Sequence, residues 1–171
     1  MATTILVSSA LQIQYDNACE DQLENAASGL CNAVLHELFP RDTYIITGQY
    51  YFPRTAGRQP LYADYIVERI WSTGQRAIVL TVEAKPEHQT EHQDAHADDQ
   101  AQDYGDATLR SHSQQRQVHV TRFISGQCIF YLLARGQTTM TAIISDFMDI
   151  QDDHAVIRAC AQTVRNTGLF T

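Results

Sequence analysis

Three charged side chains of the kinds used in hydrolytic chemistry, Asp64, Glu83 and Lys85, lie in two successive strand-like segments of the 171-residue sequence. The segments 62–71 and 76–85 are rich in β-branched and aromatic residues, and the short stretch between them contains a glycine. Such a pattern predicts a β-hairpin. Asp64 interrupts the apolar run of the first segment, and Glu83 and Lys85 end the second, so all three depart from the core-forming pattern around them.

The geometry of the hairpin predicts that these side chains meet. If residues 73–74 form a two-residue turn, Asp64 stands directly opposite Glu83 on the neighbouring strand. Because side chains alternate along a strand, Glu83 and Lys85 share one face, and Asp64 joins them there. This prediction depends on turn chemistry and alternation alone.

Two carboxylates opposed on adjacent strands repel each other unless a positive charge lies between them. A hard divalent cation such as Mg²⁺ or Mn²⁺ prefers oxygen ligands of this kind. Lys85 would then hold or deprotonate a water molecule, or stabilise a developing negative charge. The alternative is a surface salt bridge among Asp64, Glu83 and Lys85 on an exposed sheet face. Their places within apolar runs favour the metal site.

Lysine occurs once in this chain. The twelve basic residues are eleven arginines and Lys85, which lies two positions after Glu83. Arginine keeps its proton in proteins, whereas a lysine in a cleft or beside a metal can take part in proton transfer. The location of the single lysine therefore supports a chemical role for it.

The rest of the sequence predicts the elements that position this hairpin. Asn17 followed by Glu20 resembles a capping box that opens a helix, and apolar residues then recur at helical spacing up to Pro40. The polar segment 88–113 carries small residues at helical spacing and predicts a second helix. The other expected elements are strands at 44–52, 118–123, 127–134 and 138–147 and a helix at 152–166. The order α-β-β-β-α-β-β-β-α, without a repeat or linker, predicts one α/β domain over residues 1–171.

Composition indicates a folded protein of the cell interior. Hydrophobic residues make up 44% and charged residues 19% of the chain, which is typical of a sequence that buries a core. No apolar stretch has the length needed to cross a bilayer, and no basic segment precedes residues 5–7, so we expect no membrane partner and no secretory signal. The scattered cysteines favour reduced, mostly buried thiols in the cytoplasm or nucleus; they are Cys19, Cys31, Cys128 and Cys160.

Three histidines at four-residue spacing, His88, His92 and His96, would lie on one face of the second helix. Such a row can bind zinc. The many acidic and glutamine neighbours favour instead a solvated helix start without a metal role.

The spacing Asp64, eighteen residues, Glu83-Ala84-Lys85, within an α-β-β-β-α-β order, resembles the PD-(D/E)XK nuclease superfamily. The resemblance covers roughly residues 20–134 and implies a restriction-endonuclease-like core, a mixed central sheet flanked by helices. It implies that Asp64 and Glu83 bind a metal, that Ala84 contributes a carbonyl ligand, and that Lys85 is catalytic. The proline of the motif is displaced, because Pro60 lies four residues before Asp64.

The same resemblance extends to both helices that would flank the hairpin. Many members carry Q-x-x-x-Y on the following helix, which Gln100 and Tyr104 match, and a glutamate on the first helix, for which Glu20 and Glu24 both remain open. The segment 118–134 is similar to that of fungal-type members.

The resulting expectation is metal-dependent hydrolysis of phosphodiester bonds in DNA or RNA, with Gln100 orienting the attacking water or contacting phosphate. The net charge of −8 argues against a broad electrostatic grip on nucleic acid. A nuclease-like fold that serves as a binding module, or as an enzyme on a small molecule, is therefore the alternative. The oligomeric state, a homo-oligomer included, stays open. The discriminating observation is whether the arginines near the hairpin and the second helix gather around the cleft; they are Arg54, Arg58, Arg110 and Arg116.

Overall fold

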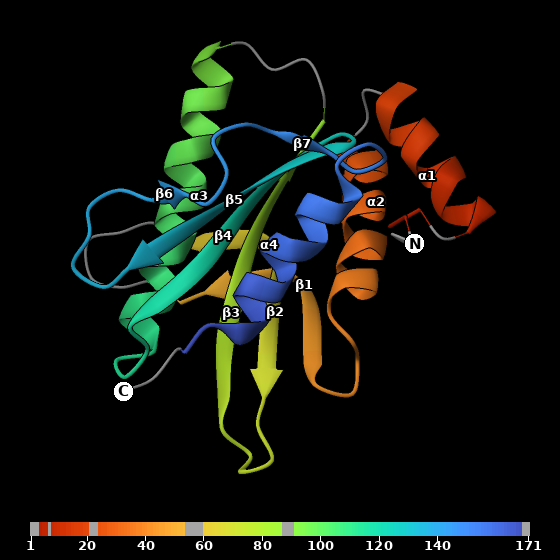
Figure 1. The fold of residues 1–171 in the computed structure, drawn as a ribbon. Helices are drawn as coiled ribbons and strands as arrows, with labels where there is room; N and C mark the ends of the chain where they lie inside the picture. Colours follow the sequence, from red (N-terminus) through yellow and green to blue (C-terminus); the bar gives the residue numbers. More distant parts are fainter. Residues whose placement is uncertain (1–3, 7, 21–23, 54–59, 87–90, 169–171) are drawn as a thin grey trace.

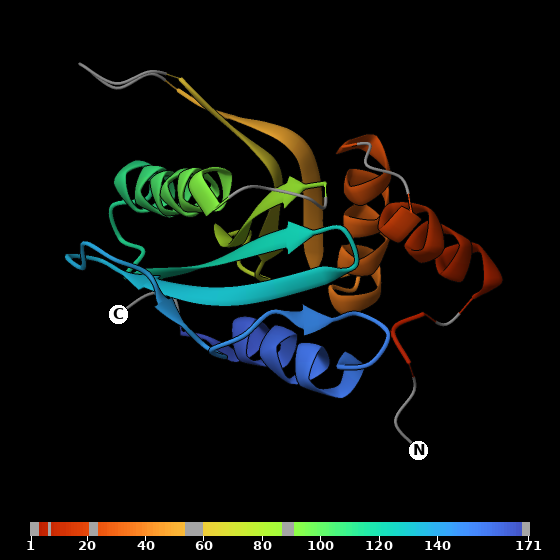
Figure 2. The same ribbon diagram turned by 90° about the horizontal axis from the view of Figure 1, so that it is seen from above.

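The computed structural model describes residues 4–6, 8–20, 24–53, 60–86 and 91–168. A mixed sheet lies at its centre, with helix α3 on one face and helices α2 and α4 on the other, while α1 packs against α2 (Figure 1; Figure 2). In chain order the elements are α1 (Ser9–Glu20), α2 (Glu24–Leu38), β1 (Tyr44–Phe52), β2 (Leu61–Ile70), β3 (Arg76–Lys85), α3 (Glu91–Ser111), β4 (Gln117–Ile124), β5 (Gln127–Ala134), β6 (Thr141–Ala142), β7 (Met148–Asp149) and α4 (His154–Asn166).

The strands follow the order β1-β2-β3-β4-β5-β6, and β7 pairs with the other end of β5. Strands β3 and β4 are parallel neighbours and the remaining pairs are antiparallel. A parallel pair needs a long crossover, and α3 supplies it across one face of the sheet. The predicted α/β class and mixed central sheet are therefore confirmed.

The N-terminal region differs from the prediction. Two helices, α1 and α2, replace the single helix expected to open at Asn17, and the predicted capping box lies inside α1. The oxygen that caps α1 belongs to Ser8, whose Oγ accepts a hydrogen bond from the Leu11 backbone at 3.2 Å. A serine at the N-cap satisfies an N–H that the first turn leaves without a partner, so the helix is capped at Ser8, nine residues before the predicted Asn17.

The strand predicted at 138–147 is also wrong. The structure has two short ladders instead, β6 and β7, which pair with opposite ends of β5. Ile143 and Ile144 lie between β6 and β7, and both pack against the apolar core that includes Phe130 and Met148. In a regular strand, consecutive side chains point to opposite faces of the sheet. Because Ile143 and Ile144 both pack on the same core, the chain cannot be a regular strand at these residues.

The turn between β2 and β3 differs from the predicted two-residue turn. Gly74 has a φ of 79°, and the Trp71 backbone donates to the Gln75 carbonyl at 3.0 Å, which closes a three-residue loop. A β-bulge then adds one residue to β3 beside Val67, so that Tyr65 pairs with Val82. The extra loop residue and the bulge offset each other, and the register expected near the candidate site is restored.

Helix α3 approaches the sheet closely at Gly105. A Cβ built there would lie 2.8 Å from Leu133 Cδ2 and 3.1 Å from Val120 Cγ2, two fully buried core side chains of the sheet. Gly29, inside α2, has nothing within 4 Å of the same position.

These two glycines give a matched pair of predictions. Gly105→Ala is expected to lower the free energy of unfolding by about 1–3 kcal/mol, because a packed core cannot accept the added methyl. Gly29→Ala is expected to raise it by about 0.5–1 kcal/mol, since alanine loses less backbone entropy in a helix. Urea unfolding of both variants checks this, and an equal effect of the two substitutions would contradict the close approach of α3.

Within the described residues, no helix combines the length and apolar character required to cross a membrane. None of the four cysteines forms a disulfide, and Cys31, Cys128 and Cys160 are buried, as predicted.

Candidate functional site

The C-terminal end of β3 holds a buried carboxylate and the single lysine. Glu83 is 1% exposed, and Lys85 Nζ lies 2.6 Å from its Oε1, with the lysine side chain 25% exposed. The ion pair shows that both side chains lie on one face of β3. Burial raises the pKa of the Glu83 carboxyl, Lys85 opposes that shift through a hydrogen bond, and the nearby charge of Asp64 raises the pKa further. The folded protein therefore disfavours the charged form of Glu83.

Helix α3 brings two of the predicted side chains to the same place. The Tyr104 ring is 1% exposed in the core, and its hydroxyl accepts a hydrogen bond from Gln100 Nε2 at 3.3 Å. The pKa of Tyr104 is raised by burial and then by the charge of Glu83 and a hydrogen bond to it. Tyr104 thus contacts the Glu83 carboxylate, and Gln100 contacts Tyr104.

Asp64 is held by the backbone of β3. The paired register of β2 and β3 ends at Tyr65 and Val82, and beyond it Asp64 Oδ2 accepts a hydrogen bond from the Ala84 N–H at 2.7 Å. The side chain therefore takes the place of a main-chain partner where the two strands separate. The recorded pairs end one residue short of Asp64 and Glu83, so their cross-strand pairing stays a prediction, while β2 and β3 are antiparallel neighbours in the expected register.

The carbonyl of Ala84 points toward β2, as its N–H does. The N–H and C=O of one strand residue point toward the same neighbouring strand. Because the Ala84 N–H is directed at Asp64, its carbonyl also faces the separation between β2 and β3, while the next carbonyl, that of Lys85, accepts from Ser125 on the other side.

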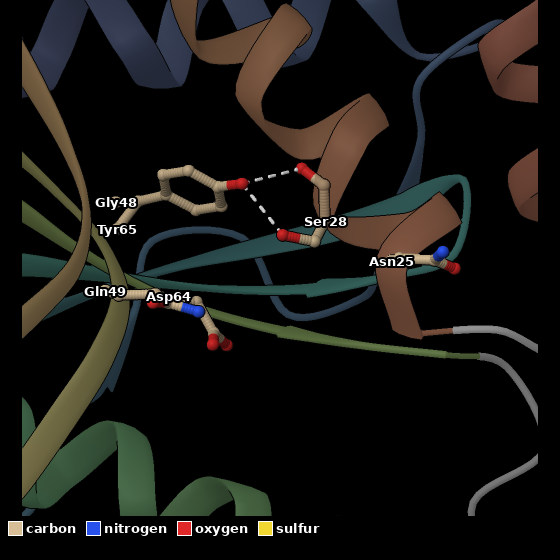
Figure 3. A pocket seen from close by; sticks show the side chains of 6 residues that line it. All are labelled: Asn25, Ser28, Gly48, Gln49, Asp64 and Tyr65. Atoms are coloured by element: carbon tan, nitrogen blue, oxygen red, sulfur yellow. Dashed lines mark hydrogen bonds between the residues drawn. The ribbon is translucent and has the colours of Figure 1, made fainter.

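A polar pocket opens beside Asp64, between α2 and the β1–β2 hairpin (Figure 3). It has a volume of about 600 Å³. The Tyr65 hydroxyl lies 2.8 Å from Ser28 Oγ and donates to the Ser28 carbonyl at 3.0 Å, which joins the hairpin to α2. The lining residues are Asn25, Ser28, Gly48, Gln49, Asp64 and Tyr65.

Both strands of the hairpin depart from regular alternation at this pocket. Gly48 and Gln49 are consecutive in β1 and both line it, as do the consecutive Asp64 and Tyr65 in β2. Gln49 has a φ of 50°, in the left-handed region that residues with side chains rarely adopt. The pairing of β1 and β2 skips Gln49 and Asp64, so the irregular backbone at Gln49 lies beside Asp64.

Oxygen donors around the separation of β2 and β3 fit a hard divalent cation. The Glu83 carboxylate is buried, and the Asp64 carboxylate and Ala84 carbonyl face the separation of β2 and β3 beside it. No group of three or more His, Cys, Asp or Glu side chains gathers as a metal cluster in the described part of the chain. Glu24 begins α2, but its side chain lies outside that part, and Glu20 is exposed at the end of α1.

Of the three histidines in the predicted row, the structure describes the side chain of one. His96 is exposed on α3, whereas His88 and the side chain of His92 lie outside the described residues.

Of the four arginines proposed as a discriminating feature, the two that the structure describes lie away from the pocket. Arg110 lies in the last turn of α3, where it is 4.0 Å from Asp106, and Arg116 just precedes β4. Both are therefore at the end of the sheet opposite Lys85. Arg54 and Arg58 lie outside the described residues.

One basic residue near the site was missed. Arg122 is the Cα partner of Glu83 on β4, is 3% exposed, and its Nη1 lies 2.7 Å from Asp98 Oδ1 on α3. This ion pair fixes the half of α3 that carries Gln100. The sequence feature that could have indicated Arg122 is its position within the apolar run of a predicted strand, where a charged side chain needs a partner.

Comparisons with models of protein families, with curated proteins and with solved structures found no match to this chain. Its class is that of an α/β protein with an open mixed sheet. Its particular feature is a buried glutamate–lysine pair beside a polar pocket.

Proposed function

We propose that this protein hydrolyses phosphodiester bonds of nucleic acid with the help of Mg²⁺ or Mn²⁺, on a restriction-endonuclease-like core. The observation that carries the proposal is the buried Glu83 carboxylate, held by the only lysine of the chain and adjacent to Asp64. A charged carboxylate with a raised pKa is costly to bury, and such groups concentrate at functional sites.

The order of the elements supports the fold assignment. Helix α2, the strands β1 to β3, helix α3 and the parallel strand β4 follow the α-β-β-β-α-β order of that core. The candidate residues lie at the end of β3 and on the middle of α3, next to the crossover. Parallel strands commonly present ligand sites at their carboxyl ends.

Asp64, Glu83 and the Ala84 carbonyl would hold the cation. Such an ion, when bound, would supply Lewis acidity toward the phosphate and would lower the pKa of a water molecule. Water contributes the oxygen that bonds to phosphorus, and the bond from phosphorus to the leaving oxygen breaks. Lys85 Nζ, partly exposed beside Glu83, would as an ammonium neutralise the charge that develops on the phosphate, or in its neutral amine form would take the proton of that water.

Two residues of α3 would position these groups. The Tyr104 hydroxyl fixes the Glu83 carboxylate, and Gln100, half-buried and bound to Tyr104, presents its amide near the attacking water. Both depend on the Arg122–Asp98 ion pair that holds this part of α3 on the sheet.

A second candidate function is favoured by the charge distribution. The net charge is −8, and the described arginines Arg110 and Arg116 lie away from the pocket. These facts suit a binding module, or an enzyme on a small molecule, built on the same fold.

Cleavage assays separate the two candidates. Purified protein with Mg²⁺ or Mn²⁺ is expected to cut single- or double-stranded DNA or RNA, and EDTA is expected to abolish the activity. Asp64→Ala should lower the rate by about 100-fold or more, since it removes a metal ligand and the anchor of Ala84. No cleavage of any of these substrates with either metal would contradict the nuclease proposal and favour the second candidate.

A further inference from the structure

The pocket between α2 and the β1–β2 hairpin has a lining suited to a nucleobase or ribose. Asn25 and Gln49 contribute side-chain amides and Ser28 a hydroxyl, next to Asp64 (Figure 3). These groups donate and accept hydrogen bonds, and the described lining includes neither lysine nor arginine. Such a lining would select a ligand by hydrogen bonding and not by attraction to phosphate.

We propose that this pocket is the subsite for an unpaired nucleotide, so that the substrate of the site is single-stranded nucleic acid. The inference rests on the proposed function and names its substrate class. A volume of about 600 Å³ is in the range of small-molecule sites. A base can enter such a pocket only when it is outside a duplex, because a paired base must first be flipped out of its stack.

The two amide side chains are suited to hydrogen-bonding the Watson–Crick edge of a base, which is accessible only when the base is unpaired. Amide side chains pair with base edges through two hydrogen bonds, and proteins that read single strands use the Watson–Crick edge of splayed bases. Gln49 enters the pocket through a left-handed backbone conformation with a φ of 50°. Residues with side chains adopt that region rarely, and such conformations concentrate at ligand sites.

Two exposed tyrosines lie further along the hairpin that forms one wall of the pocket. Tyr51 and Tyr62 are cross-strand partners with ring centroids 5.1 Å apart, and they are 46% and 60% exposed. Tyr62 lies two residues before Asp64 on β2. Exposed aromatic rings next to a nucleotide site act as stacking platforms for unpaired bases, whatever their sequence.

The net charge of the protein agrees with this substrate. Duplex binding depends on neutralising many phosphates with basic side chains. A chain with twelve basic and twenty acidic residues lacks such a surplus. Stacking and amide hydrogen bonds need no positive charge, so a few unpaired nucleotides can be bound where a duplex cannot.

Fluorescence anisotropy with a labelled ten-nucleotide single strand and the corresponding duplex tests the inference, in EDTA so that nothing is cut. The single strand is expected to bind at least tenfold more tightly than the duplex. Gln49→Gly should weaken single-strand binding about tenfold without loss of stability, because glycine accepts the left-handed conformation. Tyr62→Ala should weaken it about tenfold as well. Gln127→Ala, an exposed glutamine on β5, is the control and should bind as the wild type does.

Equal or tighter binding of the duplex would overturn the inference, as would wild-type affinity in both Gln49→Gly and Tyr62→Ala. Absence of binding to either strand form would overturn it too. If metal-dependent cleavage occurs but both variants leave the preference for single strands unchanged, the subsite fails and the nuclease proposal stands. If the single strand binds through Gln49 and Tyr62 but is never cut, the nuclease proposal fails and the nucleotide pocket stands.

Discussion

Lys85→Ala is expected to lower the rate of metal-dependent cleavage by about 10²–10⁴-fold, the usual range for the loss of a group that moves a proton or stabilises transition-state charge. Lys85 Nζ is the only lysine nitrogen of the chain and lies 2.6 Å from Glu83. Because its side chain is partly exposed at a strand end, the substitution leaves the core intact, and circular dichroism should be unchanged.

Lys85→Arg separates charge from proton transfer. Its guanidinium keeps a positive charge but holds its proton and has a planar, longer head group. We therefore expect Lys85→Arg to lose most of the activity as well. If the arginine variant keeps wild-type activity, Lys85 provides charge alone.

Arg76→Ala is the matched control for both substitutions. Arg76 is an exposed cation at the opposite end of β3. Its replacement should leave the cleavage rate within about twofold, because a distant surface charge is screened by salt. Unchanged activity in Lys85→Ala would show that the glutamate–lysine pair is structural and would favour the second candidate function.

Glu83→Gln is expected to abolish stabilisation of the protein by Mg²⁺ while making the metal-free protein more stable at neutral pH. Burial raises the pKa of Glu83 above its unfolded value, so the folded protein holds its proton to higher pH. The wild type should therefore lose stability as the pH rises from the ordinary glutamate range through this raised pKa. The neutral amide of glutamine removes that loss.

The metal acts in the opposite direction in the wild type. A cation binds the charged carboxylate, so Mg²⁺ affinity should increase as the pH rises through the same range. At 100 times its dissociation constant, Mg²⁺ would stabilise the wild type by about 2.7 kcal/mol. Thermal unfolding at acidic and neutral pH, in EDTA and in Mg²⁺, measures both effects.

Two controls accompany Glu83→Gln. Glu37→Gln removes an exposed carboxylate from α2, and we expect it to retain the wild-type response to Mg²⁺. Joint replacement of His88, His92 and His96 by alanine should also retain it, because the proposal assigns the ion to the carboxylates and not to the histidine row. Stabilisation of Glu83→Gln by Mg²⁺ to the wild-type extent would show that Glu83 is not a ligand.

Local sequence patterns predicted the strands well because each depends on short-range chemistry. The runs 44–52, 76–85 and 127–134 have the bounds of β1, β3 and β5. Their β-branched and aromatic residues favour extended backbone, and the residues that follow the first two runs, Pro53 and Pro86, suit strand ends. The proximity of Glu83 and Lys85 followed from alternation within one strand, which needs no partner.

Local sequence patterns could not predict where the first helix begins. Both Ser8 and Asn17 are good capping residues, and the sequence pattern favoured Asn17 because Glu20 follows it. The choice depends on whether residues 9–16 find a surface to pack on. Tyr15 provides the contact, since its hydroxyl donates to Asp149, far along the chain, at 2.9 Å.

The position of Asp64 was decided by tertiary structure. Alternation predicts its face only while β2 and β3 stay paired, and pairing ends at Tyr65. Beyond that residue, the Asp64 side chain is held by a hydrogen bond from the Ala84 N–H, next to the left-handed backbone at Gln49. Neither has a local signature, because one is a backbone conformation of the neighbouring strand and the other a contact across 20 residues. The sequence by itself therefore specified which residue types meet, and packing between strands specified how they are oriented.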